Sequence, residues 1–171
     1  MPKMILILIV ICLSHALLLA QAPTGQAKAI DLDATYRLSN DFSGPSKFLT
    51  ISDNDTDLDM LDATRNSKQL WKFVAMSGSR FHLVNLSAED KAVDVHKSGD
   101  SYALVMADLG DFSGQTWSFV TQNDGKFRFT NGFAGSSRSL DVHKNGDVWS
   151  VVVGDSGDYS GQAWTLTKVT E

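Results

Sequence analysis

Three Gln-x-Trp triplets recur at an almost constant spacing along the chain. They are Gln69-Leu70-Trp71, Gln115-Thr116-Trp117 and Gln162-Ala163-Trp164, which lie 46 and 47 residues apart. Longer blocks match in the same register: residues 36–40 with 81–85 and 127–131, residues 93–100 with 140–147, and residues 111–117 with 158–164. Several blocks aligned in one register indicate an internal repeat of about 46 residues.

Each repeat predicts four short β-strands. The aromatic-x-apolar-x-Asn stretch, as in residues 127–131, alternates with a period of two, which is typical of a half-buried strand. A Leu/Val-Asp-Val strand follows and then a Lys-x-Gly-Asp turn. A third strand at residues 102–107 or 149–154 and a Ser-Gly turn precede the Gln-x-Trp strand. The predicted fold class is therefore all-β.

One such unit cannot bury its own apolar face, so the three repeats must share a core. Six strands that close a barrel and six that cap one end satisfy threefold repetition, which predicts a β-trefoil with three pseudo-symmetric repeats. The repeats cover about residues 36–80, 81–126 and 127–169. The large apolar anchors of the core are predicted to be Trp71, Trp117 and Trp164. The side chains predicted to hydrogen-bond the turn backbone beneath them are Gln69, Gln115 and Gln162.

The N-terminus has the layout of a secretory signal peptide, which we place at residues 1–22. A basic start is followed by an apolar run over residues 4–11 and by small residues near the end of the segment. The alternative is a membrane anchor, but Ser14 and His15 interrupt the apolar run and no basic stop-transfer cluster follows. We expect a secreted, extracellular protein whose residues 23–35 form a flexible N-terminal segment.

Charge and cysteine content limit the possible partners. The formal net charge is −5 with no basic cluster, which argues against nucleic acid and against anionic membranes once the signal is removed. The single cysteine, Cys12, lies within the signal peptide. The mature chain must therefore be held together by packing, without disulfides.

The Gln-x-Trp triplets, their spacing and the preceding Leu/Val-Asp-Val strand resemble the ricin B-type lectin repeat. The resemblance implies a carbohydrate or glycoprotein-glycan partner, bound without cofactor in shallow pockets, up to one per repeat. It places the sugar-binding carboxylate at Asp94 in the second repeat and at Asp141 in the third, whereas Thr50 occupies that position in the first. His96 and His143 follow these aspartates and either border the pockets or cap the next turn.

The chain departs from the family pattern at the aromatic position on the third strand. Ala107 and Gly154 stand there, and neither can stack on a sugar. Exposed rings at Phe112 and Tyr159, on a turn that follows, are candidate substitutes. Equivalent aromatic residues also occur at the start of the third strand, Tyr102 and Trp149, and these are interpreted either as a cap on the barrel or as part of a site.

Two function classes therefore remain open. The first is a secreted lectin with pockets in the second and third repeats. The alternative is a β-trefoil that binds a protein partner, such as a protease inhibitor or a signalling ligand, and has degenerate sugar sites. An enzyme is not expected: Gly154-Asp155-Ser156-Gly157 looks like a serine nucleophile motif, but the repeat accounts for the segment and no base is indicated.

An acidic run in the first repeat resembles the start of a calcium loop. It places carboxylates at alternate positions of residues 53–59, but a calcium loop requires glycine and glutamate where Leu58 and Thr64 stand. We therefore predict a solvated turn and no metal site. Asn54 and Asn85 begin N-glycosylation sequons and are candidate glycan acceptors.

Overall fold

The computed structural model describes residues 30–122 and 124–170. The predicted signal peptide and the first part of the predicted flexible segment lie outside these residues. The described part of that segment, residues 30–35, is held against the barrel. The Asp31 amide donates a hydrogen bond of 2.9 Å to the Tyr36 hydroxyl, and Lys168 forms an ion pair of 2.7 Å with the Asp31 carboxylate.

Four strands and one turn of 3-10 helix make up each repeat. The strands of the first repeat are β1 (Tyr36–Asn40), β2 (Gly44–Ile51), β3 (Leu58–Asp62) and β4 (Trp71–Ala75). Those of the second are β5 (Phe81–Asn85), β6 (Ala88–Ser98), β7 (Ser101–Asp108) and β8 (Trp117–Thr121). Those of the third are β9 (Phe127–Asn131), β10 (Gly135–Asn145), β11 (Val148–Asp155) and β12 (Trp164–Lys168). The helical turns are η1 (Ser67–Gln69), η2 (Ser113–Gln115) and η3 (Ser160–Gln162).

The first and last strands of the repeats close into a six-stranded antiparallel barrel. Within each repeat they pair with each other: β1 with β4, β5 with β8 and β9 with β12. Between repeats the last strand pairs with the first strand of the next: β4 with β5, β8 with β9 and β12 with β1. The last of these pairings returns the chain to its start, so the barrel has no free edge.

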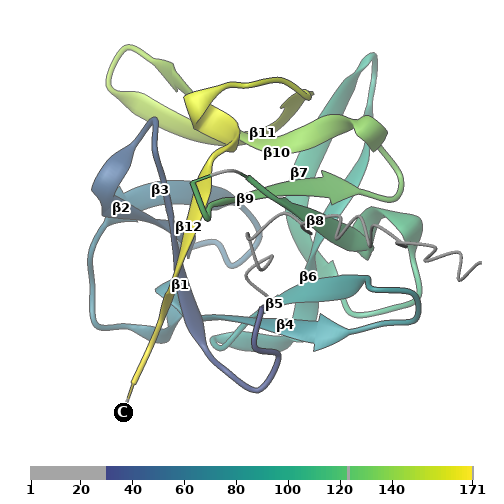
Figure 1. Cartoon of the computed structure of the whole chain (residues 1–171), viewed down its shortest axis with the longest axis horizontal. Helices are drawn as coiled ribbons and strands as arrows, with labels where there is room; N and C mark the ends of the chain where they lie inside the picture. The colour runs from purple at the N-terminus through teal and green to yellow at the C-terminus, as the bar shows by residue number, and fades with distance from the viewer. Residues whose placement is uncertain (1–29, 123, 171) are drawn as a thin grey trace, which may run out of the picture.

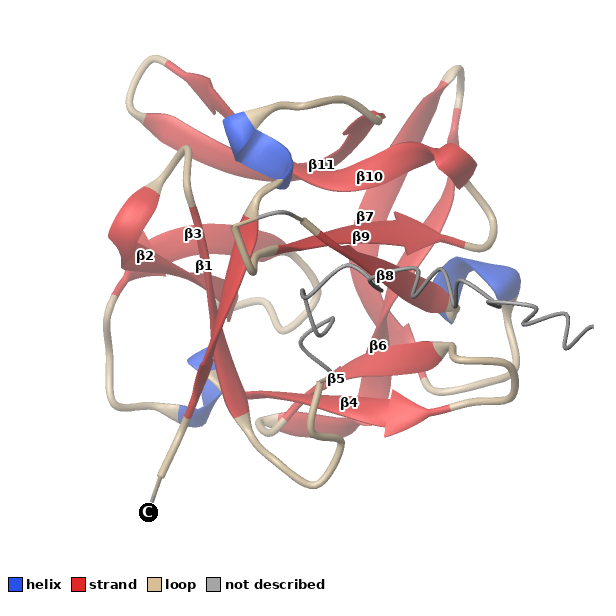
Figure 2. Ribbon diagram, in the orientation of Figure 1, coloured by secondary structure: helices blue, strands red, loops and turns tan. Residues whose placement is uncertain are grey.

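The middle strands of each repeat form a hairpin outside the barrel. The hairpins are β2–β3, β6–β7 and β10–β11, and each is joined to the barrel through its first strand. Strands β3, β7 and β11 contact one another, so the three hairpins share a cap. The hairpins lie on different sides of the barrel in Figure 1, and the three helical turns lie at separate corners in Figure 2. This arrangement confirms the predicted β-trefoil with three pseudo-symmetric repeats.

The core is built from the same positions in each repeat. Trp71, Trp117 and Trp164 are buried in one apolar cluster. Each indole nitrogen donates to a backbone carbonyl of its own repeat, of Leu49, Val93 and Leu140, at 2.9, 2.9 and 3.0 Å. Close ring contacts within the cluster are formed by Phe73, Phe81, Phe127 and Phe129. Each repeat therefore adds one tryptophan and further aromatic surface to a shared interior.

The glutamine of each triplet joins the 3-10 turn to the end of the third strand. Gln162 is fully buried, its Nε2 donates to the Asp155 carbonyl at 2.7 Å, and its Oε1 accepts from the Gly157 amide at 3.0 Å. Gln69 and Gln115 make the equivalent bonds in their own repeats. Buried polar side chains that are fully bonded in this way fix the turn beside which a pocket can form. In the part of the chain described here, no helix is long and apolar enough to cross a bilayer.

Candidate functional site

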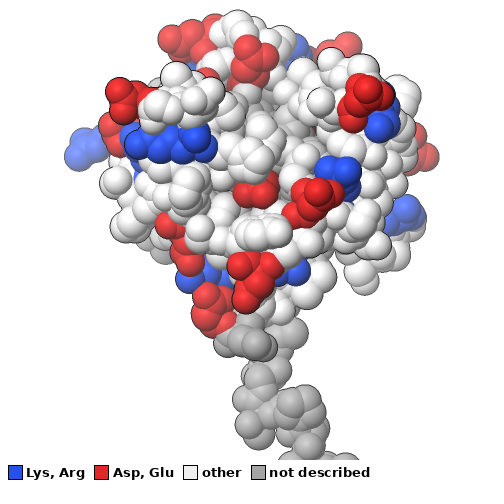
Figure 3. All heavy atoms as spheres, turned by 90° about the horizontal axis from the view of Figure 1, so that it is seen from above, with Lys and Arg blue, Asp and Glu red and all other residues white. Residues whose placement is uncertain are grey.

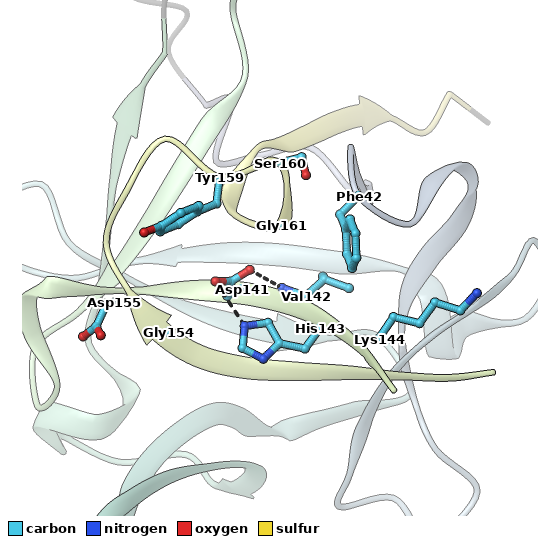
Figure 4. A pocket seen from close by; sticks show the side chains of 10 residues that line it. All are labelled: Phe42, Asp141, Val142, His143, Lys144, Gly154, Asp155, Tyr159, Ser160 and Gly161. Carbon is cyan, nitrogen blue, oxygen red and sulfur yellow. Dashed lines mark hydrogen bonds and ion pairs between the residues drawn. The ribbon is translucent and has the colours of Figure 1, made fainter. Parts of the chain in front are cut away.

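A surface hollow of about 460 Å³ lies in the third repeat, between β10, β11 and η3. Figure 4 shows Asp141 at its centre, with Tyr159 on one side and Phe42 on the other. Its further lining residues are Val142, His143, Lys144, Gly154, Asp155, Ser160 and Gly161. The chain thus brings one carboxylate and two aromatic rings from three separate segments around a single space.

The Asp141 carboxylate is fixed by the protein before any ligand arrives. Its Oδ1 accepts from the Val142 amide at 2.7 Å, and its Oδ2 accepts from Gln162 Nε2 at 2.9 Å. The Asp141 side chain is 7% exposed, and His143 Nε2 lies 3.5 Å from the same Oδ2. The carboxylate is therefore held in one orientation at the bottom of the hollow, with a small part of it open to a ligand.

Two glycines make room for this carboxylate. A Cβ atom at Gly154 would lie 2.6 Å from Asp141 Oδ2, and one at Gly161 would collide with Oδ1 and lie 2.7 Å from the Val142 carbonyl oxygen. Neither position accepts a side chain while Asp141 keeps this rotamer. The position where the sequence comparison expected a stacking ring is therefore the floor of the hollow, and the aromatic residues lie on its walls.

The two wall aromatics are largely exposed. The Tyr159 ring is 59% exposed and lies close against Gly157, where a Cβ would collide with it. Phe42, at 45% exposure, belongs to the β1–β2 turn of the first repeat. Its ring meets the Trp149 ring edge to face at 5.5 Å. Neither exposed ring fills the core, so both are available to a ligand.

The second repeat carries a similar set of residues in equivalent places, with an identical aspartate, glycine and glutamine. Asp94 Oδ2 accepts from Gln115 Nε2 at 3.2 Å, and a Cβ at Gly114 would collide with Asp94 Oδ1. Phe112 takes the place of Tyr159 with the same 59% exposure. Ala107 stands where the third repeat has Gly154, so the floor of this second candidate site carries one extra methyl group.

The first repeat has different residues at the positions that form this site. Thr50 stands at the aspartate position and Lys68 at the position of Gly161. Lys68 reaches across the acidic turn and pairs with Asp53 at 3.3 Å and Asp55 at 3.1 Å. The hydrogen bonds with Asp55 and then Asp53 raise the Lys68 pKa. The carboxylate of this repeat lies instead on β3 at Asp59, opposite Thr50.

Asp59 is partly buried and lies near a second carboxylate. Partial burial raises its pKa, and the nearby Asp57 carboxylate raises it further. Asp59 lines a smaller hollow of about 320 Å³ together with Thr50 and Lys68. Lys68 stands in this hollow at the position of Gly114 and Gly161 in the other two repeats.

The histidines that follow the two aspartates are exposed. His143 lines the hollow, and its Nε2 lies 3.5 Å from Asp141 Oδ2 (Figure 4). Its ring lies beside the Asp141 carboxylate, between the two aromatic walls (Figure 4). His96 has the equivalent exposed position next to Asp94.

Two further predictions concerned modification and metal binding. Asn54 lies in an exposed turn, which suits a glycan acceptor. A glycan at Asn85 is incompatible with this fold, because Asn85 is fully buried and its Nδ2 donates to the Lys68 carbonyl at 3.0 Å. Over residues 30–122 and 124–170, no group of three or more His, Cys, Asp or Glu side chains is arranged to hold a metal ion.

The serine in the apparent nucleophile motif has a structural environment. The Ser156 hydroxyl lies 2.7 Å from the Ser139 hydroxyl and 3.2 Å from the Ser136 carbonyl. These contacts join the end of β11 to β10. The hydroxyl is thus part of the hydrogen bonding between these two strands.

Phe42 was missed at the sequence level, although the repeat contains the signal. The compared block ended at the asparagine of β1, β5 and β9. Two residues beyond that asparagine stand Phe42, Ser87 and Phe133 in the three repeats. The sequence places this turn in the first repeat. It reaches the hollow of the third repeat because β1 pairs with β12 when the barrel closes.

Comparison with known proteins gives a structural likeness. No family model matches the sequence, and no curated protein matches it. The designed threefold symmetric protein ThreeFoil superposes with a TM-score of 0.70 at 22% identity, over 79% of this chain and 99% of that one. A ricin B-like lectin of Macrolepiota procera in complex with lactose gives 0.66 at 18% identity, over 81% and 98%.

A longer protein contains a similar unit. A mosquitocidal holotoxin matches with a TM-score of 0.73 and 17% identity over 83% of this chain, but the match spans 18% of the holotoxin. The described part of the chain has the β-trefoil fold that ricin B-like lectins share.

On the face shown in Figure 3, acidic and basic side chains of the present chain are interspersed.

Proposed function

We propose that this protein binds carbohydrate, with its principal site at Asp141 in the third repeat and a second site at Asp94. The observation that carries the proposal is the oriented Asp141 carboxylate at the centre of a shallow hollow with an aromatic wall. A sugar presents paired hydroxyls on one edge and C–H groups on its faces. Such a ligand matches a carboxylate acceptor beside an exposed ring.

Binding at this site needs no bond cleavage. Hydroxyls of one sugar ring would donate to the part of the Asp141 carboxylate that faces the hollow, and Tyr159 would cover part of the sugar. Hydrogen bonds to an ionised acceptor are stronger than neutral ones, but an open hollow keeps single-site affinity modest. Two sites on one rigid body then strengthen attachment to a surface that displays many glycans.

We further propose that the protein acts outside the cell. The layout of residues 1–22 as a signal peptide supports secretion, and the exposed sequon at Asn54 fits an extracellular chain. Secretion is tested by expressing the full chain in a eukaryotic host and determining the N-terminus of the protein in the medium. Retention of the complete chain in the cell membrane would contradict this part of the proposal.

A protein partner is the alternative. It is favoured by the apolar side chains that remain exposed on the surface, among them Val148 at 65% and Val120 at 56% exposure, neither of which lines the Asp141 hollow. A partner that used these surfaces would leave both aspartates idle. The two proposals therefore differ in what the aspartates contribute to binding.

A glycan array separates these possibilities. The purified wild-type chain and the variants Asp141→Asn, Asp94→Asn and the double variant are compared on an array that includes lactose and other galactosides. Asparagine keeps the shape but replaces one acceptor oxygen by a donor, so we expect Asp141→Asn to weaken binding by roughly tenfold or more. Asp147→Asn, in an exposed turn, is the matched control. Unchanged binding in the double variant, or no glycan bound by the wild type, would overturn the proposal.

A further inference from the structure

We infer that each sugar site is shared between two repeats, and that the principal stacking ring comes from the neighbouring repeat: Phe42 for Asp141 and Phe133 for Asp94. This inference rests on the proposed function and specifies how the site recognises the apolar face of its ligand. It assigns a binding role to two residues that lie outside the repeats whose carboxylates they serve.

The floor of the hollow excludes an aromatic residue of its own. Gly154 stands where a ring on the third strand would be needed, and even a Cβ there would lie 2.6 Å from Asp141 Oδ2. A ring that faces a sugar held by this carboxylate must therefore come from a wall. Phe42 and Tyr159 are the two aromatic residues that line the hollow, and they come from opposite sides (Figure 4).

A buried asparagine connects Phe42 directly to the floor of the site. Asn40 Nδ2 donates to the Gly161 carbonyl at 2.8 Å, and Asn40 Oδ1 accepts from the Phe42 amide at 3.0 Å. The Asn40 side chain thus fixes the position of Phe42 relative to Gly161, on which Asp141 packs. The second site repeats the device through Asn131, which bonds the Gly114 carbonyl at 2.7 Å and the Phe133 amide at 3.0 Å.

The arrangement beside the first repeat is the same but lacks the ring, and it is supplied by the β5–β6 turn of the second repeat. Asn85 Nδ2 donates to the Lys68 carbonyl at 3.0 Å, and Asn85 Oδ1 accepts from the Ser87 amide at 2.9 Å. The turn is therefore built alike in all three places, and phenylalanine is not needed to build it. Phenylalanine occurs only beside the two repeats in which an aspartate packs on the glycine that precedes the Gln-x-Trp triplet. This distribution indicates that the ring serves the ligand and is not required by the fold.

Neighbouring side chains hold the two rings in similar poses. Phe42 meets Trp149 edge to face at 5.5 Å, and Phe133 meets Tyr102 edge to face at 6.2 Å. Lys144 Nζ lies 4.9 Å from the centre of the Trp149 ring, and Lys97 Nζ lies 4.4 Å from that of Tyr102. Phe42 and Phe133 remain 45% and 43% exposed. A ring that is held at its edge but open to solvent is preorganised for stacking.

The test isolates one site at a time in the full chain. Asp94→Asn is the background, so that the remaining glycan binding reports the Asp141 site, and the probe is the strongest glycan that the wild type binds on the array. In this background we test Phe42→Ser, because Ser87 is the equivalent residue beside the first repeat. The substitution is expected to weaken binding about tenfold, or ~1.4 kcal/mol. Phe42→Tyr should keep binding within about threefold, because the stacking face is retained. Val74→Ser, at an apolar side chain of similar exposure that does not line the hollow, is the control and should leave binding unchanged.

The outcomes distinguish the inference from the proposed function. If Asp141→Asn removes binding while Phe42→Ser leaves it intact, the carbohydrate site stands and the shared-site inference is overturned. If the wild type binds no glycan, both are overturned. Equal losses for Phe42→Ser and Val74→Ser would also contradict the inference, since of these two residues Phe42 alone lines the hollow. Thermal unfolding midpoints equal to that of the background show that a loss of binding is not a loss of fold.

Discussion

The first and third repeats use the same framework and differ in what stands on it. Both bury a tryptophan that donates to the carbonyl before the aspartate position, and both bury a glutamine that bonds the same turn. On this framework the third repeat has Asp141 over Gly161, and the first has Thr50 beside Lys68. The residues that build the fold are kept, and the residues around the hollow change together.

The change is concerted because the positions are in physical contact. A side chain at the position of Gly161 and the Asp141 carboxylate would occupy the same space. Aspartate therefore requires glycine there, whereas the smaller threonine tolerates the lysine of the first repeat. Tyr159 is replaced by Asn66 in the first repeat, and Phe42 has its counterpart in Ser87. The residues around the hollow therefore change as a set, in line with our proposal of two sites.

The largest expected effect comes from importing the lysine of the first repeat into the third. Gly161→Lys should destabilise the protein by about 3 kcal/mol and abolish binding at Asp141, since its Cβ would collide with the carboxylate and lie 2.7 Å from the Val142 carbonyl oxygen. Denaturant unfolding and the glycan array measure the two effects. The pair Asp141→Thr and Gly161→Lys together should recover about 1 kcal/mol or more of that loss. If the stability effects of Asp141→Thr and Gly161→Lys simply add, the two positions are not coupled and this account of the difference between the repeats is wrong.

A second prediction separates framework from site. Gln162→Ala and Gln69→Ala should each lower the free energy of unfolding by about 2–3 kcal/mol, because each leaves buried turn groups without a partner. Glycan binding should fall only for Gln162→Ala, whose Nε2 also holds Asp141. Denaturant titration gives the stability, and binding is measured under conditions in which both variants are folded. Equal loss of binding in both would mean that the effect arises from the fold as a whole.

A third prediction rebuilds a site. Leu61 stands at the position of Gly154 in the first repeat. The combination of Thr50→Asp, Leu61→Gly, Lys68→Gly, Asn66→Tyr and Ser87→Phe therefore gives the first repeat the set found in the third. We expect one additional glycan-binding site per chain, at an affinity within about tenfold of the Asp141 site. Binding stoichiometry by calorimetry is the measurement, and the same set without Ser87→Phe is the control. A stoichiometry equal to that of the wild type would show that further residues define the site.

The smallest effect concerns the carboxylate that remains in the first repeat. Burial, and then Asp57, raise the Asp59 pKa in the folded protein above its ordinary value of 3.8. The folded state therefore binds this proton more tightly than the unfolded chain does, and stability is lost as the pH rises through the folded-state pKa. Asp59→Asn should raise the unfolding midpoint slightly at pH 7 and leave it unchanged at pH 3. A reduced midpoint at pH 7 would mean that the charge is stabilising, with Lys68 as its partner.

The sequence allowed the fold to be predicted because the repeat is visible without any structure. Three triplets in one register require three units with a shared core, and the tryptophan and glutamine positions follow from the pattern. The family resemblance also indicated Asp94, Asp141 and Thr50 as equivalent positions, and their part in binding stays a prediction. The sequence pattern failed at Asn85, because a sequon reports a local tripeptide and not whether its amide is buried.

What the linear sequence determined by itself is the repeated unit: which strands form, where they turn, and which residue each unit offers for burial. These depend on local periodicity and on neighbours in the chain. Only the tertiary structure decided which residues meet, since closure of the barrel between β1 and β12 brings the turn of Phe42 to the pocket of Asp141. That meeting joins residues about a hundred positions apart, and it depends on strand pairing that no local pattern encodes.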